Sequence, residues 1–263
     1  MLLKAEYSEI ERPVSALQRA ERLLATRAPI ALFLDFDGTL VDVALTPESV
    51  SVPPELSAIL SDISHRLSGA LAIVTGRRIS EADRLLRPLR FTAAGVHGAE
   101  MRLAPEGAIE PQALSFDPAL KAEIKRTVEA LPGVVMEDKG GGIALHYRLA
   151  PEFEQPLRHT LELLKPQYPG QFKICGGRKV YELLPIGFSK GNALNKLAAL
   201  HTFKDRLPLM IGDDVADVGA FRAAEHLGGV GLKVAGENFS EDEAAFRGPT
   251  EVRAWLKALA RVL

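Results

Sequence analysis

Two aspartates stand one residue apart directly behind an unbroken apolar run in the segment ALFLDFDGTLVD, residues 31–42. One carboxylate can attack a phosphoryl group to form an aspartyl-phosphate, and a second acid can protonate the leaving oxygen and then activate water. At a strand end that turns into a loop, residues i and i+2 can face one pocket. The spacing favours Asp35 as the nucleophile and Asp37 as the general acid/base, although D-x-D-G taken alone can also be an ordinary turn. Asp42, the third acid of the segment, has no role that the pattern assigns.

Two further apolar runs, ALAIVTGR and LPLMIGDD, also end in polar residues, which are Thr75, Gly76, Arg77, Asp213 and Asp214. In a doubly wound sheet, ligands bind outside the carboxyl ends of the strands, so we expect these ends to converge. Clustered carboxylates repel one another unless a cation lies among them. The combination favours one catalytic site over three unrelated turns.

A divalent metal ion is the expected cofactor, because Mg²⁺ prefers carboxylate and phosphate oxygens. The expected metal set is Asp35, Asp37 through its carbonyl, Asp213 and Asp214. Asp214 could act through a metal-bound water, as could Asp217.

Phosphate oxygens require donors and positive charge. We expect Thr75 and the backbone N–H groups after it, including those of Gly76 and Arg77, to bind them. Lys190, in GFSKGNAL at the start of a predicted helix, can neutralise the phosphate from the other side. The alternative for Lys190 is a solvated lysine beside the helix-capping Ser189.

The elements that must position these residues alternate between strands and helices. The apolar runs predict buried parallel strands near 29–36, 70–76 and 207–214, and helical patterns lie at 53–67, 80–89 and 189–203. This order predicts an α/β fold with a doubly wound, Rossmann-like parallel sheet. Further helices are expected near 14–26 and 250–263, with the second packing on the core.

The middle of the chain has a different pattern. From 104 to 186 a Pro- and Gly-rich stretch is followed by the order helix, strand, strand, which occurs twice. Such a segment predicts an antiparallel sheet with two helices on one face. We therefore expect a core formed by 1–103 and 187–263, with an α+β cap domain of 104–186 inserted between its halves.

Composition narrows the class of partner. The chain has 263 residues, 47% of them hydrophobic, and a formal net charge of -2 at pH 7. It offers no basic footprint for nucleic acid or an anionic membrane, so a small molecule is favoured. We expect neither a secretory signal in the charged N-terminal stretch nor a membrane span. The lone Cys175 excludes an internal disulfide, and we expect a cytoplasmic monomer.

The motifs DFDGTL, VTGR, FSKG and IGDD, in that order, resemble those of the haloacid dehalogenase-like phosphohydrolases. In that superfamily Asp37 favours phosphatases or phosphomutases over dehalogenases, which lack this acid, and over P-type ATPases. The inserted segment resembles the C2-type cap. The stretches GVHGAEMR, EDKGGGIALHYR, KVYELLPIGFSKGNAL and GDDVADVGAF resemble the trehalose-6-phosphate phosphatase branch.

This resemblance implies Mg²⁺-dependent hydrolysis of trehalose 6-phosphate through a phosphorylated Asp35, and a functional link to trehalose-6-phosphate synthase. Phosphoryl chemistry would fall on Asp35, Asp37, Thr75, Lys190, Asp213 and Asp214. Sugar contacts would fall on His97, Gly98, Glu100, Glu137, Lys139, Arg148 and Glu182, of which two or three could instead be plain surface residues. Hydroxyl groups suit such acids and lysines.

The chain departs from the pattern of the branch at four positions, Leu184, Ala216, Val218 and Gly219. The metal acids remain, so these departures concern the outer metal shell and the sugar specificity. Three alternatives stay open: another sugar phosphatase, acting on a sucrose, mannosylglycerate or hexose phosphate; a sugar phosphomutase; and a non-catalytic sugar-phosphate sensor.

Overall fold

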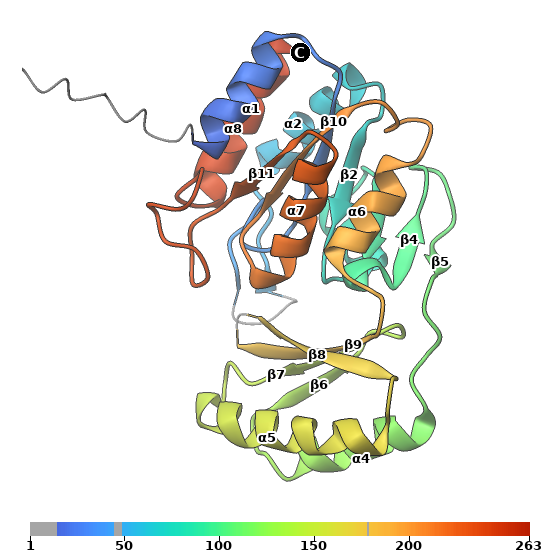
Figure 1. The fold of residues 1–263 in the computed structure, drawn as a ribbon. Helices are drawn as coiled ribbons and strands as arrows, with labels where there is room; N and C mark the ends of the chain where they lie inside the picture. Colours follow the sequence, from blue (N-terminus) through green and yellow to red (C-terminus); the bar gives the residue numbers. More distant parts are fainter. Residues whose placement is uncertain (1–14, 45–48, 178) are drawn as a thin grey trace, which may run out of the picture.

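The computed structural model describes residues 15–44, 49–177 and 179–263. In this part of the chain the strands form two separate sheets, one of seven strands and one of four. Figure 1 shows the larger sheet with its helices above the smaller one. The N-terminal stretch in which we expected no secretory signal falls largely in 1–14, outside the described residues.

The larger sheet has the order β11-β10-β1-β2-β3-β4-β5. Its strands are β1 (Ile30–Leu34), β2 (Leu71–Val74), β3 (Thr92–Gly95), β4 (Glu100–Arg102), β5 (Glu110–Pro111), β10 (Leu207–Gly212) and β11 (Val230–Lys233). β1, β2, β3, β10 and β11 are parallel to their neighbours in this group, while β4 pairs antiparallel with β3 and β5. All residues of β1 and β2 are buried, which explains their continuous apolar sequence.

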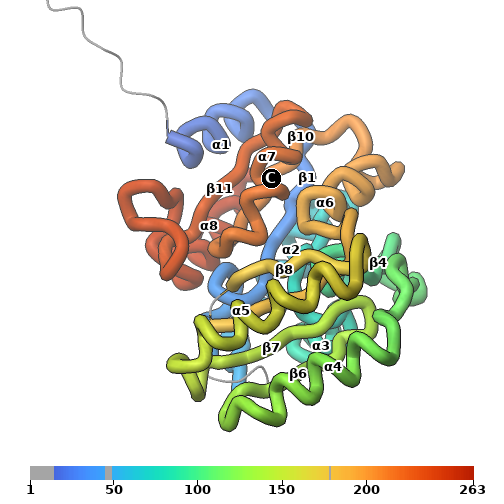
Figure 2. Tube along the Cα trace, turned by 60° about the horizontal axis from the view of Figure 1, so that its bottom comes forward, coloured from blue at the N-terminus to red at the C-terminus, as the bar shows by residue number. Residues whose placement is uncertain are grey.

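Helices cover both faces of this sheet (Figures 1 and 2). They are α1 (Ala16–Ala25), α2 (Pro54–Arg66), α3 (Ile79–Leu85), α6 (Lys190–Ala198), α7 (Val218–His226) and α8 (Pro249–Val262). α6 packs against α7, and α2 packs against α8, whose buried residues include Val252 and Leu256. The predicted doubly wound α/β core is confirmed, including the packing of the C-terminal helix on it.

The smaller sheet is antiparallel, with the order β6-β7-β9-β8. Its strands are β6 (Val135–Asp138), β7 (Ile143–His146), β8 (Phe172–Gly177) and β9 (Val180–Pro185). α4 (Pro118–Glu129) and α5 (Glu154–Leu164) cover one face and the other faces the core (Figure 1). Figure 2 looks from the cap side, with α4 and α5 in front of this sheet.

Alternating side chains separate the two faces of the cap sheet. Leu145 and Leu183 point into an apolar cluster with Leu120 of α4 and Leu161 of α5. The intervening residues of these strands face the core. The cap therefore has a hydrophobic core of its own and presents its second face to the large sheet.

Two features of the strands lie outside the sequence expectations. β3, β4 and β11 are short strands in segments for which we predicted no strand, and β5 lies within the range that we assigned to the cap although it pairs with β4 of the core sheet. Among the described helices, none is long and apolar enough to span a membrane.

Candidate active site

A cavity of about 530 Å³ lies between the carboxyl ends of the core strands and the free face of the cap sheet. This volume falls in the usual range of small-molecule sites, about 300–1,000 Å³. The sequence-predicted residues that line it are Asp35, Asp37, Thr75, Gly76, Arg77, His97, Glu137, Lys139, Arg148, Glu182, Lys190, Asp213 and Asp214. One cavity thus brings together residues from both halves of the core and from the cap.

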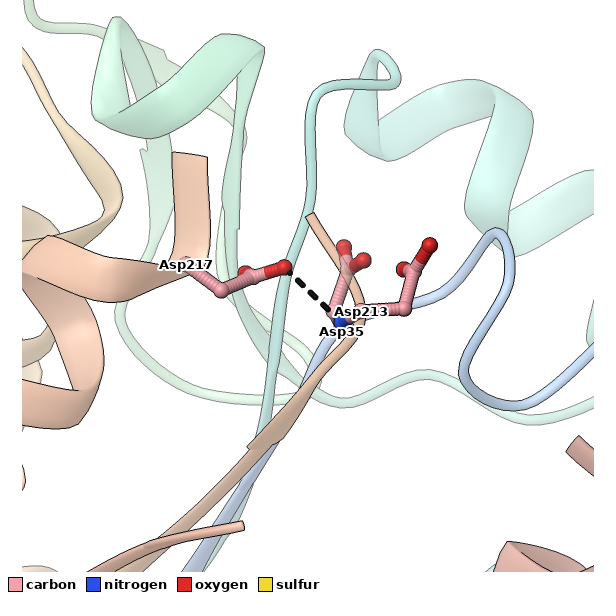
Figure 3. A group of neighbouring side chains, drawn as sticks. All are labelled: Asp35, Asp213 and Asp217. Carbon is pink, nitrogen blue, oxygen red and sulfur yellow. Dashed lines mark hydrogen bonds between the residues drawn. The ribbon is translucent and has the colours of Figure 1, made fainter. Parts of the chain in front are cut away.

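Three buried carboxylates meet at the core end of this cavity, where Asp35 and Asp213 line it and Asp217 lies behind them. Asp35 follows β1, Asp213 follows β10, and Asp217 lies in the short helix after β10 (Figure 3). Ligand atoms of all three lie within 4.8 Å of one another. Gly38, at φ +76°, allows this approach, because a Cβ there would stand 2.3 Å from Asp213 Oδ2.

Lys190 lies between two of these acids. Its Nζ atom is 2.7 Å from Asp35 Oδ1 and 2.7 Å from Asp217 Oδ1, and its side chain is only 3% exposed. Burial alone would lower the pKa of Lys190, but Asp217 and Asp35 outweigh burial and raise it, so the ammonium stays protonated. The structure therefore does not bear out the alternative of a solvated lysine.

Both oxygens of the Asp217 carboxylate accept hydrogen bonds from other groups of the protein. Its Oδ1 accepts from Lys190, and its Oδ2 accepts from the backbone N–H groups of Asp213, at 3.2 Å, and Asp214, at 3.0 Å. Figure 3 shows the bond to the Asp213 amide. Asp217 thereby fixes both Lys190 and the turn that carries Asp213, a role larger than the water contact that the sequence predicted for it.

The cluster fits a divalent cation. Three buried carboxylates outnumber the one ammonium group among them, and burial followed by the nearby Asp217 raises the pKa of Asp35. Carboxylate oxygens at these separations are the donors that Mg²⁺ or a similar hard cation requires. Asp214 lies beside the cluster, where its side chain accepts from Val215 N–H and Asn238 Nδ2.

Asp37 and Arg77 form a two-point ion pair across neighbouring strand ends. Arg77 Nε donates to Asp37 Oδ2 at 2.6 Å, and Arg77 Nη2 donates to Asp37 Oδ1 at 2.7 Å. The Arg77 backbone N–H also donates to Thr75 Oγ1 at 3.1 Å. The hydrogen bond from the Arg77 N–H to Thr75 therefore stabilises the loop after β2, and the Arg77 side chain on this loop binds the Asp37 carboxylate.

A polar network joins the cap to this core loop. Glu182 of β9 contacts His97 Nε2 at 2.5 Å and Lys139 Nζ at 3.0 Å. Lys139 also donates to the carbonyl oxygen of Gly76, at 2.8 Å. Burial alone would raise the pKa of Glu182, but His97 and Lys139 hold it far below its ordinary value. The predicted sugar-contact residues thus bridge core and cap.

Two more cap residues reach the cavity with partners of their own. Glu137 Oε2 lies 2.9 Å from His146 Nε2, and Arg148 Nη1 donates to the Ala44 carbonyl at 2.6 Å. His146 and Glu81, to which the sequence analysis assigned no role, line the same cavity. Glu81 lies four residues after Arg77, and its carboxylate is 4.0 Å from Arg77 Nη1. This spacing of opposite charges was the sequence signal that could have placed Glu81 at the site.

Two predicted sugar contacts lie elsewhere. Glu100 accepts from the Ile79 N–H at the start of α3 and does not line the cavity. Gly98 is also absent from the lining, and its missing Cβ allows close packing on Ala193 of α6. Gly98 therefore lets the loop that carries His97 pack on α6, and Glu100 binds the backbone at the start of α3.

Comparison with known proteins identifies a family and relatives of this chain. The family model described as trehalose-phosphatase matches residues 33–248. The chain is 42% identical over 205 residues to a probable trehalose-phosphate phosphatase of Sinorhizobium fredii, covering 78% of this chain and 77% of the relative. It is 34% identical over 239 residues to the trehalose-6-phosphate phosphatase of Escherichia coli, covering 90% and 88%.

Solved structures agree on the fold. The C-terminal domain of the trehalose-6-phosphate phosphatase of C. albicans superposes with a TM-score of 0.80 at 20% identity, covering 95% of this chain and 99% of that one. A haloacid dehalogenase-like hydrolase from Bacteroides thetaiotaomicron gives a TM-score of 0.64 at 14% identity, covering 88% and 99%. The haloacid dehalogenase-like fold expected from the motifs is confirmed.

Proposed function

The chain belongs to the trehalose-phosphatase family, whose members are phosphoric monoester hydrolases, and on this premise we propose that it hydrolyses trehalose 6-phosphate to trehalose and phosphate. The observation that carries the proposal is the single cavity in which the carboxylate cluster of the core meets the polar residues of the cap. The core residues supply phosphoryl chemistry, and the cap residues supply hydroxyl recognition.

Asp35 is the nucleophile in this proposal. Its carboxylate oxygen attacks phosphorus, the bond from phosphorus to the sugar oxygen breaks, and Asp37 gives that oxygen a proton. Asp37 then removes a proton from water as the water attacks the aspartyl-phosphate, which releases phosphate and restores Asp35. Asp37 thereby acts first as an acid and then as a base, and both aspartates end the cycle in the state in which they began it.

The charges around Asp35 support this step. Lys190 presents a fixed ammonium group 2.7 Å from the Asp35 carboxylate, and Thr75 and Gly76 line the same cavity. Asp35 and Asp213 are the proposed side-chain ligands of Mg²⁺, with the Asp37 carbonyl and Asp214 nearby, and the ion would supply charge neutralisation for the phosphoryl oxygens.

Sugar hydroxyls would be bound by the network that joins core and cap. Glu137, Lys139 and Glu182 line the cavity together, and carboxylates with an ammonium group suit the donor and acceptor character of hydroxyls. His97 contributes from the core side. Since the Lys139 contact to Gly76 joins cap and phosphate loop, a closed cap would also exclude bulk water.

A phosphate-release panel tests the substrate. We expect trehalose 6-phosphate to give the highest kcat/KM among trehalose, sucrose, mannosylglycerate and hexose phosphates, with activity that depends on Mg²⁺. A large preference for a monosaccharide phosphate would refute the proposal. Isomerised sugar phosphate in place of free phosphate would indicate a phosphomutase, and tight binding without turnover would indicate a sensor.

The remaining parts of the proposal rest on sequence composition and family resemblance. We propose a cytoplasmic monomer that acts on the product of a trehalose-6-phosphate synthase. We also propose that the chain divides into the catalytic core and a specificity cap, with β5 belonging to the core because it pairs with β4.

A further inference from the structure

The free face of the cap sheet carries two transverse rows of side chains, set by the strand register. In the first row Glu137 pairs with Ala144, which pairs with Glu182. In the second row Val135 pairs with His146, which pairs with Val180. The two rows have different chemistry, because the first carries two carboxylates and the second carries two valines.

Both rows face the same cavity. Glu137, Glu182, Val135, His146 and Val180 all line it, and the contact between Glu137 and His146 joins the rows on one face. The first row is the one joined to the core by Lys139 and His97, so it lies on the side of the phosphate loop. The second row is two residues away along each strand and lies farther from that loop.

The second row leaves apolar surface open to solvent. Val135 is 54% exposed, and Leu149, which lines the same cavity, is 67% exposed. On the opposite face of the same sheet, Leu145 and Leu183 are fully buried under α4 and α5. Exposed apolar side chains that line a cavity together with a few polar groups are typical of a ligand-binding site.

The spacing of the rows suits a ligand of two rings. Residues i and i+2 of a strand are separated by about 6.6 Å, which is of the order of the step between adjacent sugar rings. A monosaccharide phosphate would bind with its phosphate at Lys190 and its hydroxyls at Glu137 and Glu182. It would then not contact the second row. A disaccharide phosphate would reach it.

We infer that Val135, His146 and Val180, together with Leu149, form the subsite for the second, unphosphorylated sugar ring, an inference that rests on the proposed function. The C–H face of a pyranose packs on the two valines. His146, oriented by Glu137, offers a ring nitrogen at the same level. The second row therefore sets the preference for a disaccharide phosphate over a monosaccharide phosphate.

Filling the subsite tests this inference. Val180→Phe places a ring in the open row, and Val135→Ala removes apolar contact without adding bulk. Leu163→Phe is the matched control, because Leu163 is 57% exposed on α5, which covers the opposite face of the cap sheet. Each variant is assayed with trehalose 6-phosphate and with 4-nitrophenyl phosphate, which needs only the phosphate site, and thermal unfolding checks its fold.

We expect Val180→Phe to lower kcat/KM for trehalose 6-phosphate about tenfold or more through KM, and Val135→Ala to lower it about threefold. Activity toward 4-nitrophenyl phosphate should stay within about twofold of wild type, as should both activities of Leu163→Phe. Unchanged constants for trehalose 6-phosphate in both row variants, or equal losses on the two substrates, would overturn the inference alone. A wild-type chain without trehalose 6-phosphate turnover would refute the proposed function and the inference together.

Discussion

Arg77 holds Asp37 through two parallel hydrogen bonds, one from Nε at 2.6 Å and one from Nη2 at 2.7 Å. The two residues come from the ends of neighbouring strands, β1 and β2, and the Arg77 side chain is only 8% exposed. A two-point contact fixes the plane of the carboxylate as well as its position. Arg77 is therefore placed to orient the proposed general acid/base.

Arg77→Lys should lower kcat about 10- to 100-fold with a smaller effect on KM, because lysine keeps the charge and loses the planar fork. Steady-state kinetics on trehalose 6-phosphate measure both constants. If Arg77 served only to bind substrate, KM would rise and kcat would remain near the wild-type value.

Gly38→Ala should lower phosphate release about 100-fold or more, because a Cβ at this position would overlap the Asp213 carboxylate. Gly170→Ala is the matched control. Gly170 has a similar φ of +74° and no neighbouring atom within 4 Å of a built Cβ, so it pays only the backbone cost of about 1–2 kcal/mol. Equal activity losses in the two variants would show that backbone strain, and not the carboxylate cluster, causes the effect.

Chelation of divalent cations should abolish phosphate release, and Mg²⁺ should restore it. Since the buried cluster has more carboxylates than ammonium groups, Mg²⁺ should also raise the unfolding temperature of the wild-type chain. Asp213→Asn should lose this increase in Tm, measured by calorimetry. A Tm that Mg²⁺ leaves unchanged in the wild type would contradict the metal assignment.

Glu182→Gln should reduce the free energy of unfolding by about 1–3 kcal/mol at neutral pH, because it removes the charge that balances Lys139 and His97. The pKa of Glu182 in the folded chain lies far below its ordinary value of 4.5. Its stabilising contribution is therefore complete above about pH 4.5 and is lost as the pH falls further, toward the folded pKa. Urea unfolding at a series of pH values measures this.

The contrast between wild type and Glu182→Gln isolates that titration. Between pH 8 and pH 5 Glu182 is ionised in the folded and in the unfolded chain, so its titration should not change the difference in unfolding free energy. The difference should shrink below about pH 4.5. A difference that grows as the pH falls would show that the pKa of Glu182 is raised on folding.

The core of the fold and the floor of the site were predictable from local sequence. Asp35, Thr75 and Asp213 each follow a continuous apolar run, and such runs become buried parallel strands whose ends meet. The order helix, strand, strand, which occurs twice in the cap segment, likewise indicated its antiparallel sheet. In these cases the nearest neighbours along the chain decide the structure.

The rest depended on contacts that local pattern does not encode. Thr92–Gly95, β3 in the structure, is a short strand in a central sheet, and its small residues give little periodic signal. Asp217 orients Lys190 through a hydrogen bond between residues 27 positions apart in the sequence. Glu100 likewise accepts from Ile79 at the start of α3, a contact that its own sequence neighbours do not indicate. Val135 and Val180 are aligned through His146 of β7, which pairs with both. The sequences of β6 and β9 alone therefore do not predict this alignment.

The most direct test of the central claim compares phosphate release from trehalose 6-phosphate by the wild-type chain and by Asp35→Asn. The wild type should release trehalose and phosphate in equal amounts. Asp35→Asn should lose at least about 10³-fold in kcat, since it removes the nucleophile, and keep the secondary structure and cooperative unfolding of the wild type. An Asp35→Asn chain that is folded and retains more than about a tenth of the wild-type rate would contradict the account.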